Sequence, residues 1–525
     1  MSTCRFKLFL MSFARVFSAQ TELLSGRIVS VEVDTSKGMN NFSIVGLGDR
    51  AVDEARDRVG SALKNSGFES PKHKNQKTIV SLSPADLKKE GSHFDLAIAV
   101  GYLISEGLST KNLDKSLFIG ELALDGGIRP TRGILAIALK AKEEGFTEIF
   151  VPKENALEAT LVEGLTVFSV SKLGELVKHL STKTESQNRL VPFSRDTGVT
   201  PFSKPETDFG DIIGQESAKR GLLIAAAGGH NIIMYGPPGS GKTMLARALA
   251  GILPELSQSD AMEVTAIHSI AGGKNISGLH SIAPFRAPHH TSSYVSVIGG
   301  GTFPKPGEVT LAHRGVLFLD EFPEFDRRVV ESLREPLEEH FVSIARSKGT
   351  AVFPAQFLFV AAMNPCPCGF KGSKTKICSC TASDLVRYRR KLSGPLLDRI
   401  DIALYVGEIG YDKLAAGGGE AQSEKIRAII NQARERAFAR SRALGLHPKQ
   451  NGELKGKDLP SVAPLSPEVE KVLNDSATRL GLSARAYHRT QKLARTIADL
   501  DNSAEITKDH ILEAIRYRPQ IENIA

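Results

Sequence analysis

The chain has 525 residues, of which 41% are hydrophobic and 24% are charged, and its 67 Lys and Arg residues face 59 Asp and Glu residues. At about 150 residues per domain this length predicts about three domains, and the composition excludes a mainly disordered chain. No run of about 18 apolar residues is free of charges, so neither a membrane-spanning helix nor a membrane partner is expected. The net charge of +8 is compatible with nucleic acid as a partner. Five cysteines are too few for a disulfide scaffold and indicate a reducing compartment, which we take to be the cytoplasm.

Residues 1–26 form an extension that we leave outside the first domain. Short apolar pieces stand beside Arg5 and Lys7, and Arg15 interrupts any apolar core. The apolar stretch is about half as long as an export signal requires. We therefore expect a start of translation at Met11 rather than a signal peptide.

The rest of the chain divides into three blocks and a linker. Residues 27–180 alternate strand-like runs with amphipathic helices, which predicts a mixed α/β domain. Its expected strands are 28–33, 42–45, 78–82 and 149–151, and its expected helices are 51–65, 94–103 and 134–142. Residues 181–208 are polar, contain several prolines and are typical of a linker. A second α/β domain is expected over residues 209–410, and helical periodicity dominates residues 411–525.

A glycine-rich loop follows the apolar strand expected at 231–235. Residues 236–243 fit the pattern G-x-x-x-x-G-K-[ST], and a helix is expected over 244–253. In this arrangement backbone N–H groups surround a phosphate, and the helix dipole favours its negative charge. Lys242 can reach the β- and γ-phosphates, and Thr243 can ligate Mg²⁺. The expected nucleotide contacts are Gly236, Pro237, Pro238, Gly239, Ser240, Gly241, Lys242, Thr243 and Met244.

Two further expected strands end in polar side chains that suit nucleotide hydrolysis. Asp320 and Glu321 follow the apolar run 315–319, and Asn364 follows the run 357–362. Functional groups of α/β sheets gather at the carboxyl ends of the strands, so we expect the acidic strand to neighbour the strand of the loop. Asp320 would hold Mg²⁺ and Glu321 would polarise the attacking water. Asn364 would orient that water or sense the γ-phosphate.

Four of the five cysteines gather in one short segment. They form two C-x-C pairs, Cys366 with Cys368 and Cys378 with Cys380. Four thiolates in a short loop suit tetrahedral Zn²⁺, which would staple the excursion that follows Asn364. A redox-active disulfide cluster is the alternative, and a cytoplasmic setting argues against it.

The order of these motifs resembles that of AAA+ ATPases in the branch of magnesium chelatase subunits and minichromosome maintenance helicases. Three phrases resemble the bacterial YifB/ComM group of magnesium chelatase-like proteins: residues 224–231, 285–291 and 483–489. The resemblance covers about residues 13–518. It implies ATP and Mg²⁺ as cofactors and a ring of six identical subunits. It further implies that Arg399 is an arginine finger that completes the neighbouring subunit's site, and that Arg485 senses the nucleotide state.

Two segments resemble inserts of this ATPase branch. Residues 264–314 resemble the insert that points into the pore of the ring, and residues 341–354 predict a β-hairpin. In related helicases such a hairpin contacts DNA, so Arg346 and Lys348 would contact phosphates. A solvated hairpin tip is the alternative. Adjacent histidines point apart and chelate poorly, so we expect His289 and His290 to have packing or hydrogen-bonding roles.

The expected helix 425–444 carries five arginines, Arg427, Arg434, Arg436, Arg440 and Arg442. A basic helix can bind nucleic acid. A solvated face with ion pairs is the simpler interpretation.

Residues 84–96 and 120–130 resemble the Lon protease domain, which has a ribosomal-S5-like fold. Lon needs a serine nucleophile in contact with a lysine base. Here Leu135 stands at the base position, and His93 stands near the nucleophile position with Ser92 one place away. Proteolysis is therefore not expected. The expected fold class is a multidomain α/β chain with a degenerate Lon-like domain, an AAA+ core and a C-terminal helical lid.

The resemblance implies an ATP-hydrolysing ring that translocates on DNA. Relatives of the ComM type act as hexameric branch-migration helicases in natural transformation, so DNA is the first interpretation for the substrate. One alternative is the ATPase subunit of a chelatase that inserts Mg²⁺ into a porphyrin. The N-terminal domain has no evident use there, which favours DNA. The other alternative is a remodelling ATPase that does not use DNA.

Overall fold

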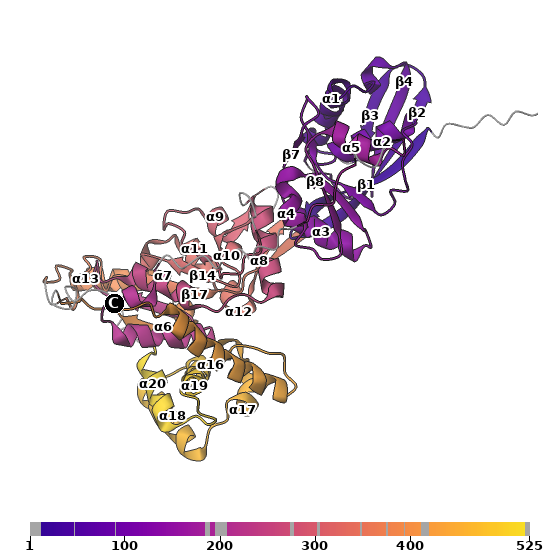
Figure 1. The fold of residues 1–525 in the computed structure, drawn as a ribbon. Coiled ribbons are helices and arrows are strands. Elements are labelled where there is room, and N and C mark those ends of the chain that lie inside the picture. Colours follow the sequence, from indigo (N-terminus) through magenta and orange to yellow (C-terminus); the bar gives the residue numbers. More distant parts are fainter. Residues whose placement is uncertain are drawn as a thin grey trace, which may run out of the picture. The chain divides into compact units, whose positions relative to one another are not determined.

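The structure is a computed structural model (Figure 1), and the chain forms two compact units. The first consists of Met1–Pro201 with Thr265–Leu279, and the second consists of Phe202–Val264 with His280–Ala525. The structure describes residues 12–46, 48–89, 91–183, 189–194, 207–272, 278–301, 305–346, 349–373, 376–392, 394–410 and 419–519.

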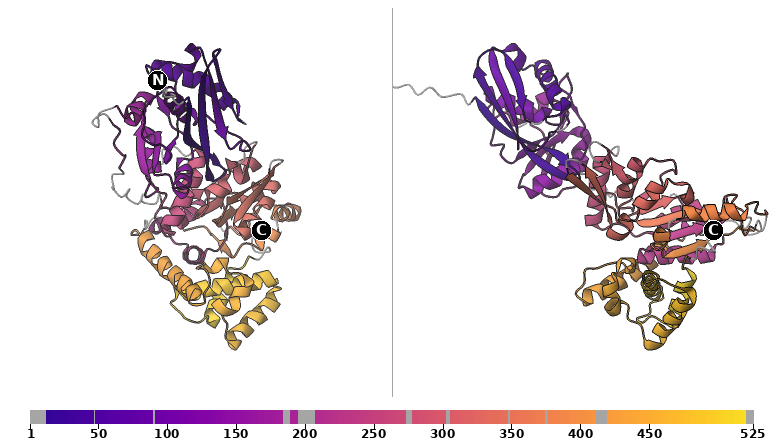
Figure 2. Two further views of the ribbon diagram at one scale, coloured as in Figure 1. Left: turned by 90° about the vertical axis from the view of Figure 1, so that its right-hand side faces the viewer. Right: turned by 180° about the vertical axis from the view of Figure 1, so that it is seen from behind.

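A seven-stranded mixed sheet forms the frame of the N-terminal unit, coloured indigo and purple in Figure 2. The strand order is β3-β4-β2-β1-β5-β8-β9. The pairs of β2 with β1 and β4 are antiparallel, and the other pairs are parallel. The bounds are β1 Phe13–Glu22, β2 Ser25–Lys37, β3 Asn41–Val45, β4 Gln76–Ser83, β5 Ser116–Phe118, β8 Glu148–Pro152 and β9 Thr166–Val170, with a separate short pair of β6 Glu121–Leu122 and β7 Ile128–Arg129.

Strand β1 lies in residues that the sequence analysis left outside the domain. It pairs with β2 along its whole length, and Val16 and Ala19 are fully buried. The N-terminal domain therefore begins before residue 27. The strand was not predicted because Arg15 interrupts the apolar run. In the structure the Arg15 side chain lies on the exposed face of the sheet.

The helices of the N-terminal unit follow the apolar periodicity. Helix α1 (Arg50–Asn65) buries Val52, Val59 and Leu63, and the Asp49 side chain caps its first turn. Helix α2 (Asp95–Ser105) is buried almost throughout and packs on β1 and β2. The remaining helices are α3 Ile134–Glu143, α4 Ala156–Ala159 and α5 Leu173–Leu180, with 3-10 turns η1 Pro71–His73 and η2 Lys153–Asn155.

Helix α8 (Gln258–Ala271) begins in the second unit, but Thr265–Leu279 group with the N-terminal residues. In that group the buried Ser269 hydroxyl donates a hydrogen bond to Glu158. The sequence predicts this segment as part of the 209–410 domain, because nothing in one continuous helical run marks a change of unit. Within the expected linker, the Phe193 N–H donates to the Val167 carbonyl at 2.7 Å, so that part packs on the first unit.

A five-stranded parallel sheet forms the centre of the second unit. Its order is β11-β14-β17-β10-β18. The three inner strands, β14, β17 and β10, are almost completely buried. This explains why they are continuous apolar runs rather than alternating ones. The bounds are β10 Ile232–Tyr235, β11 Phe285–Arg286, β14 Val316–Leu319, β17 Leu358–Met363 and β18 Ile402–Tyr405.

Short helices and two hairpins surround this sheet. The predicted hairpin over residues 341–354 is confirmed as the antiparallel pair β15 (Phe341–Arg346) and β16 (Gly349–Pro354). A second pair is β12 (Gly299–Gly300) with β13 (Lys305–Pro306). The helices are α6 Glu216–Gly228, α7 Lys242–Ile252, α9 Tyr294–Ile298, α10 Glu308–Leu311, α11 Arg327–Ser332, α12 Pro336–Glu339, α13 Ala382–Lys391 and α14 Gly394–Leu397, with 3-10 turns η4 Phe209–Asp211 and η5 Phe322–Glu324.

The C-terminal part is helical, as predicted, and its helices gather in one group (orange to yellow in Figure 1). The Thr507 side chain caps the last helix. The bounds are α16 Ser423–Ala443, α17 Leu459–Val462, α18 Pro467–Leu480, α19 Ala484–Leu500 and α20 Lys508–Arg516, with 3-10 turns η6 Asn451–Glu453 and η7 Gly456–Asp458.

The arginines of α16 hold this helix to its neighbours. Arg434 donates to the Ala226 carbonyl at 2.6 Å, and burial lowers its pKa to about 10. Arg440 donates to both carboxylate oxygens of Asp499 at 2.7 Å. These two arginines are packing residues, which differs from the solvated face that the sequence suggested.

A buried carboxylate joins the sheet to the C-terminal helices. Asp401, directly before β18, accepts hydrogen bonds from Arg489 at 2.5 Å and from the Asn231 N–H at 3.0 Å. His230 lies 3.6 Å away. Burial alone would raise the pKa of Asp401, but Arg489 and His230 outweigh burial and hold that pKa well below its usual range.

Replacing Asp401 with asparagine should lower the free energy of unfolding by about 3 kcal/mol, because it removes the charge partner of Arg489 in a buried site. The folded-state pKa is lower than that of the unfolded chain. The stabilisation is therefore fully present above about pH 4 and is lost as the pH falls further. Urea denaturation of both proteins at several pH values measures this. The control is Asp475→Asn at an exposed position of α18, and a difference that stays constant down to about pH 2 would contradict the prediction.

Candidate nucleotide-binding site

The polar strand ends predicted from the sequence meet at one edge of the five-stranded sheet. Lys242 follows β10, Asp320 and Glu321 follow β14, and Asn364 follows β17. These strands are parallel, so their carboxyl ends share an edge. One expectation was wrong in detail, because β17 lies between β10 and β14. Asn364, rather than the acidic pair, therefore comes from the strand next to the loop.

The glycines of the loop have separate structural reasons. A Cβ atom at Gly236 would lie 2.0 Å from the Val406 carbonyl oxygen, so no side chain fits there. Gly239 and Gly241 have φ angles of +74° and +91°, which other residues rarely adopt. The loop thus turns tightly from β10 into α7 and directs backbone toward the sheet edge.

Lys242 lies inside this loop. Its ammonium group donates to the carbonyl oxygens of Gly236 and Pro237, each at 2.9 Å, and lies 3.4 Å from Asn364 Oδ1. Burial lowers the pKa of Lys242, and the charge of Asp320 acts in the opposite direction. The Lys242 ammonium group therefore lies between the backbone of the loop, which can surround a phosphate, and the side-chain amide of Asn364 at the end of the neighbouring strand β17.

An oxygen-rich group stands beside the lysine. The Thr243 hydroxyl donates to Asp320 Oδ2 at 2.8 Å, so both oxygens can serve one Mg²⁺ ion. Glu321 has a left-handed backbone with φ of 51°, and His290 Nδ1 lies 3.1 Å from its Oε2. The sequence predicts a packing or hydrogen-bonding role for His290 but does not identify Glu321 as its partner.

The two arginines implied by the resemblance come together on one carboxylate. Arg399 contacts Glu338 Oε2 at 2.5 Å, and Arg485 contacts the other oxygen of Glu338. Arg399 is buried, whereas the Arg485 side chain is 45% exposed. Arg399 precedes β18, so it stands at the amino edge of a strand whose parallel neighbour, β10, carries the loop at its carboxyl edge. Sequence alone gave no sign of Glu338.

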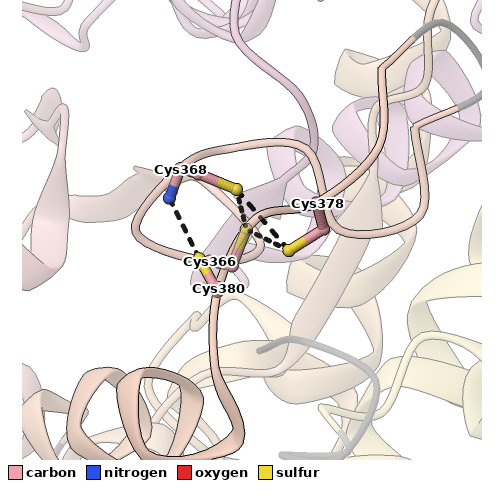
Figure 3. A group of neighbouring side chains, drawn as sticks. All are labelled: Cys366, Cys368, Cys378 and Cys380. Carbon is pink, nitrogen blue, oxygen red and sulfur yellow. Dashed lines mark hydrogen bonds between the residues drawn. The ribbon is translucent and has the colours of Figure 1, made fainter.

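The four cysteines converge on one point (Figure 3). Cys366 Sγ lies 3.4 Å from Cys368 Sγ and 3.7 Å from Cys378 Sγ, and the last two are 3.5 Å apart. All four sulfur atoms lie within 4.8 Å of one another. A tetrahedral Zn²⁺ site with Zn–S bonds of about 2.3 Å has sulfur atoms about 3.8 Å apart, so the arrangement can hold a metal ion.

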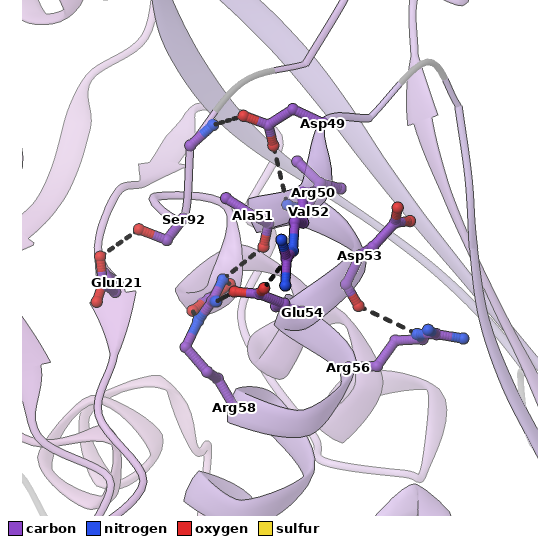
Figure 4. Close-up of polar contacts among 12 residues, drawn as sticks. Asp49, Arg50, Ala51, Val52, Asp53, Glu54, Arg56, Arg58, Ser92 and Glu121 are labelled. Carbon is purple, nitrogen blue, oxygen red and sulfur yellow. Dashed lines mark hydrogen bonds and ion pairs between the residues drawn. The ribbon is translucent and has the colours of Figure 1, made fainter.

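The N-terminal unit has a polar cluster where the Lon-like pattern places its nucleophile (Figure 4). Ser92 points toward Glu121 and donates a hydrogen bond to it. Lys89 is buried and donates to the Pro84 carbonyl, and Leu135 is buried in α3. The Ser92 hydroxyl thus contacts a carboxylate rather than the lysine amine that a Lon-type dyad requires.

The remaining site expectations fall on other parts of the chain. Lys348 and the side chain of Arg346 lie outside the described residues, so their contact with DNA stays a prediction. His289 hydrogen-bonds with Thr291 at 2.8 Å, in agreement with a local role. Within the described part of the chain, no helix combines the length and apolar character needed to cross a membrane.

Known proteins resemble this chain over nearly its whole length. It is 40% identical over 512 residues to YifB of Salmonella typhimurium, covering 97% of each chain. It is 39% identical over 516 residues to the competence protein ComM of Haemophilus influenzae, covering 97% of this chain and 98% of the relative. The chain belongs to the YifB/ComM family of magnesium chelatase-like proteins.

Family models agree with this membership. Residues 208–414 match the model "Magnesium chelatase, subunit ChlI", and residues 420–518 match the C-terminal model of that subunit. Residues 31–155 match "Subunit ChlI of Mg-chelatase". A 67 kDa subunit of magnesium chelatase from Chlorobaculum parvum is 26% identical over 162 residues, which is 30% of this chain. This magnesium chelatase-like AAA+ family implies ATPase activity.

Replacing Gly236 with alanine should weaken nucleotide binding by about tenfold or more, because the added Cβ must push the loop away from Val406. Titration with a fluorescent ATP analogue measures this. The matched control is Gly410→Ala, whose Cβ would meet no atom within 4 Å. Equal affinity of both variants would show that the close approach of the loop to β18 does not matter for binding.

Proposed function

We propose that the protein is an ATP-hydrolysing AAA+ ring motor that translocates on DNA, with branch migration as its reaction. The observation that supports ATP hydrolysis best is the convergence of Lys242, Thr243, Asp320, Glu321 and Asn364 at one sheet edge. The family membership supports the same chemistry.

The side chains at this edge suit distinct tasks in phosphoryl transfer. Lys242 and the loop backbone bind the β- and γ-phosphates, and Thr243 and Asp320 hold Mg²⁺. Glu321 accepts the proton of the attacking water and is oriented by His290. Asn364 positions that water next to the γ-phosphate. Negative charge develops on the phosphoryl oxygens during the transfer, and a further cation would stabilise it.

We propose that Arg399 supplies this cation to a neighbouring subunit in a hexamer and that Arg485 senses the nucleotide state at the same shared site. Both contact Glu338, and Arg399 stands at the amino edge of the sheet, away from the loop of its own chain. A cleft of about 1170 Å³ opens at this edge, and its lining includes Glu338, Arg485 and Arg489. Such a cleft can receive the nucleotide edge of a second copy, which makes each site shared between two subunits.

DNA is the proposed substrate for two reasons. A relative that matches over 98% of its own length is named the competence protein ComM, and the resemblance described above links that type to branch migration on DNA. The chain also carries a net charge of +8, as expected of a protein that contacts phosphates. The predicted contacts are Arg346 and Lys348 on the hairpin of β15 and β16.

A second candidate function is that of a chelatase ATPase subunit. All three family models carry the name of such a subunit, and one of them covers the N-terminal domain. That domain therefore does not argue against a chelatase, contrary to the sequence analysis. DNA is preferred because a full-length relative is named a competence protein, whereas the magnesium chelatase subunit matches only 30% of this chain.

We also propose that the four cysteines bind one structural Zn²⁺ ion. Cys366 is fully buried, and the backbone N–H groups of Lys371 and Cys368 donate to the sulfur atoms of Cys366 and Cys380. Such N–H donors stabilise thiolates, and four thiolates at these separations match the ligand preference of Zn²⁺. The ion would supply a cross-link and leave no open position for catalysis.

Purified protein should hydrolyse ATP, and branched or single-stranded DNA should raise the rate several-fold, because a motor couples turnover to its track. A coupled ATPase assay with and without DNA measures this, and Lys242→Ala serves as the inactive reference. Hydrolysis that Lys242→Ala abolishes but that no DNA stimulates would preserve the ATPase and refute the DNA substrate. Stimulation by a porphyrin-binding chelatase partner would then favour the second candidate.

Mixing Lys242→Ala with Arg485→Ala subunits should recover about a quarter of the normal ATPase rate, although each variant alone is inactive. In a random mixture about a quarter of the sites combine an intact loop with an intact arginine from the neighbour. The ATPase rate is measured after the subunits have exchanged. Arg479→Ala, at an exposed position of α18, is the control and should keep its full rate alone. A mixture as inactive as its components would exclude shared sites.

A further inference from the structure

The loop that carries the four cysteines (residues 366–380) is connected to Asn364 at both of its ends. Cys366 follows Asn364 by two residues at the end of β17. Helix α13 begins at Ala382, two residues after Cys380, and its buried Tyr388 donates to the Asn364 carbonyl at 3.0 Å. The chain thus leaves Asn364, passes through the cysteines and returns to Asn364.

The same loop also lies against the phosphate-binding loop. Gly369 has a φ of +85°, and its N–H donates to the Cys366 carbonyl at 3.0 Å, which closes a turn around the first two cysteines. A Cβ atom at Gly369 would lie 2.7 Å from Pro238 Cγ. The turn therefore packs on Pro238 so closely that only glycine fits.

The cysteines fasten the two ends of this loop to each other. Cys366 comes from the β17 side and Cys380 from the α13 side, and the Cys368 N–H donates to Cys380 Sγ at 3.4 Å. The sulfur atoms are at separations typical of ligands to one ion, as described above. A bound metal would fix the distance between β17 and α13, and hence the position of the residue that both of them hold.

We infer that a metal ion bound by the four cysteines, Zn²⁺ by its ligand chemistry, positions Asn364 for ATP hydrolysis by joining β17 to α13. The inference rests on the ATPase and zinc site proposed above and extends them. The cysteines are positioning residues, because none of them is expected to touch the nucleotide. Lys242 begins α7 and the loop glycines lie between β10 and α7, outside the segment that the cysteines join, so we expect the metal to affect hydrolysis more than nucleotide binding.

The experiment compares the wild type with Cys378→Ser, Asn364→Ala and the double variant. Cys378 is the ligand to replace, because it is only partly buried, whereas Cys366 is in the core. Ser379→Ala changes the exposed neighbour in the same loop and is the matched control. For each protein the zinc content, the affinity for a non-hydrolysable ATP analogue, and kcat and KM for ATP are measured.

The expected zinc content is about one ion per chain in the wild type, in Ser379→Ala and in Asn364→Ala, with a clear loss in Cys378→Ser. Cys378→Ser should lower kcat by about 10-fold to 100-fold and change the affinity for the analogue by less than about threefold. The double variant should be no slower than Asn364→Ala, since both changes act on one residue. Zinc removal from the wild type by a chelator should lower kcat equally, and added Zn²⁺ should restore it, which keeps the test valid if Cys378→Ser does not fold.

Three results would overturn the inference. The first is a Cys378→Ser protein that has lost its zinc but keeps the full kcat. The second is a double variant in which the kcat losses of the two single variants multiply. The third is a wild type that contains no zinc as purified and binds none when Zn²⁺ is added. A wild type that binds zinc but hydrolyses no ATP would instead overturn the proposed ATPase function. The two failures are therefore distinguishable.

Discussion

Parallel alignment of the five strands in the second unit is the constraint on which the candidate site depends. Parallel strands bring their carboxyl ends to one edge, so residues from three distant parts of the chain lie within hydrogen-bonding distance there. The strands must be apolar on both faces because helices cover them, and this leaves the polar strand ends as the places where function can reside. A break in that alignment would separate Lys242 from Asn364 without changing any residue of the site.

The same constraint explains what could be predicted from the sequence. A continuous apolar run that ends in Asp320, or in Asn364, indicates a buried strand and its functional end. The order of the strands in the sheet cannot be predicted in this way. It depends on which apolar segments pair with each other, and nothing in the sequence indicates those pairs. The prediction that β14 neighbours β10 was therefore wrong, and β17 lies between them. Strand β1 was missed for a local reason, since Arg15 on the exposed face masked the alternation.

Contacts between distant segments were the least predictable part. Glu338 lies on the short helix α12 and has no motif around it, yet it contacts Arg399 and Arg485 from two other segments. The arginines of α16 suggested a solvated face, whereas Arg434 and Arg440 are used inside the bundle. The sequence of a helix shows which side chains are charged. Whether those side chains are buried depends on the segments that pack against the helix.

The shared carboxylate of Glu338 has an electrical consequence. One carboxylate carries a single negative charge, whereas two guanidinium groups carry two positive charges, so this trio retains a net positive charge. Because Arg399 is buried and Arg485 is half-exposed, the uncompensated charge faces outward through Arg485. An arriving polyanion would therefore meet an attractive field before any side chain moves. Competition for Glu338 would then link the movement of one arginine to that of the other.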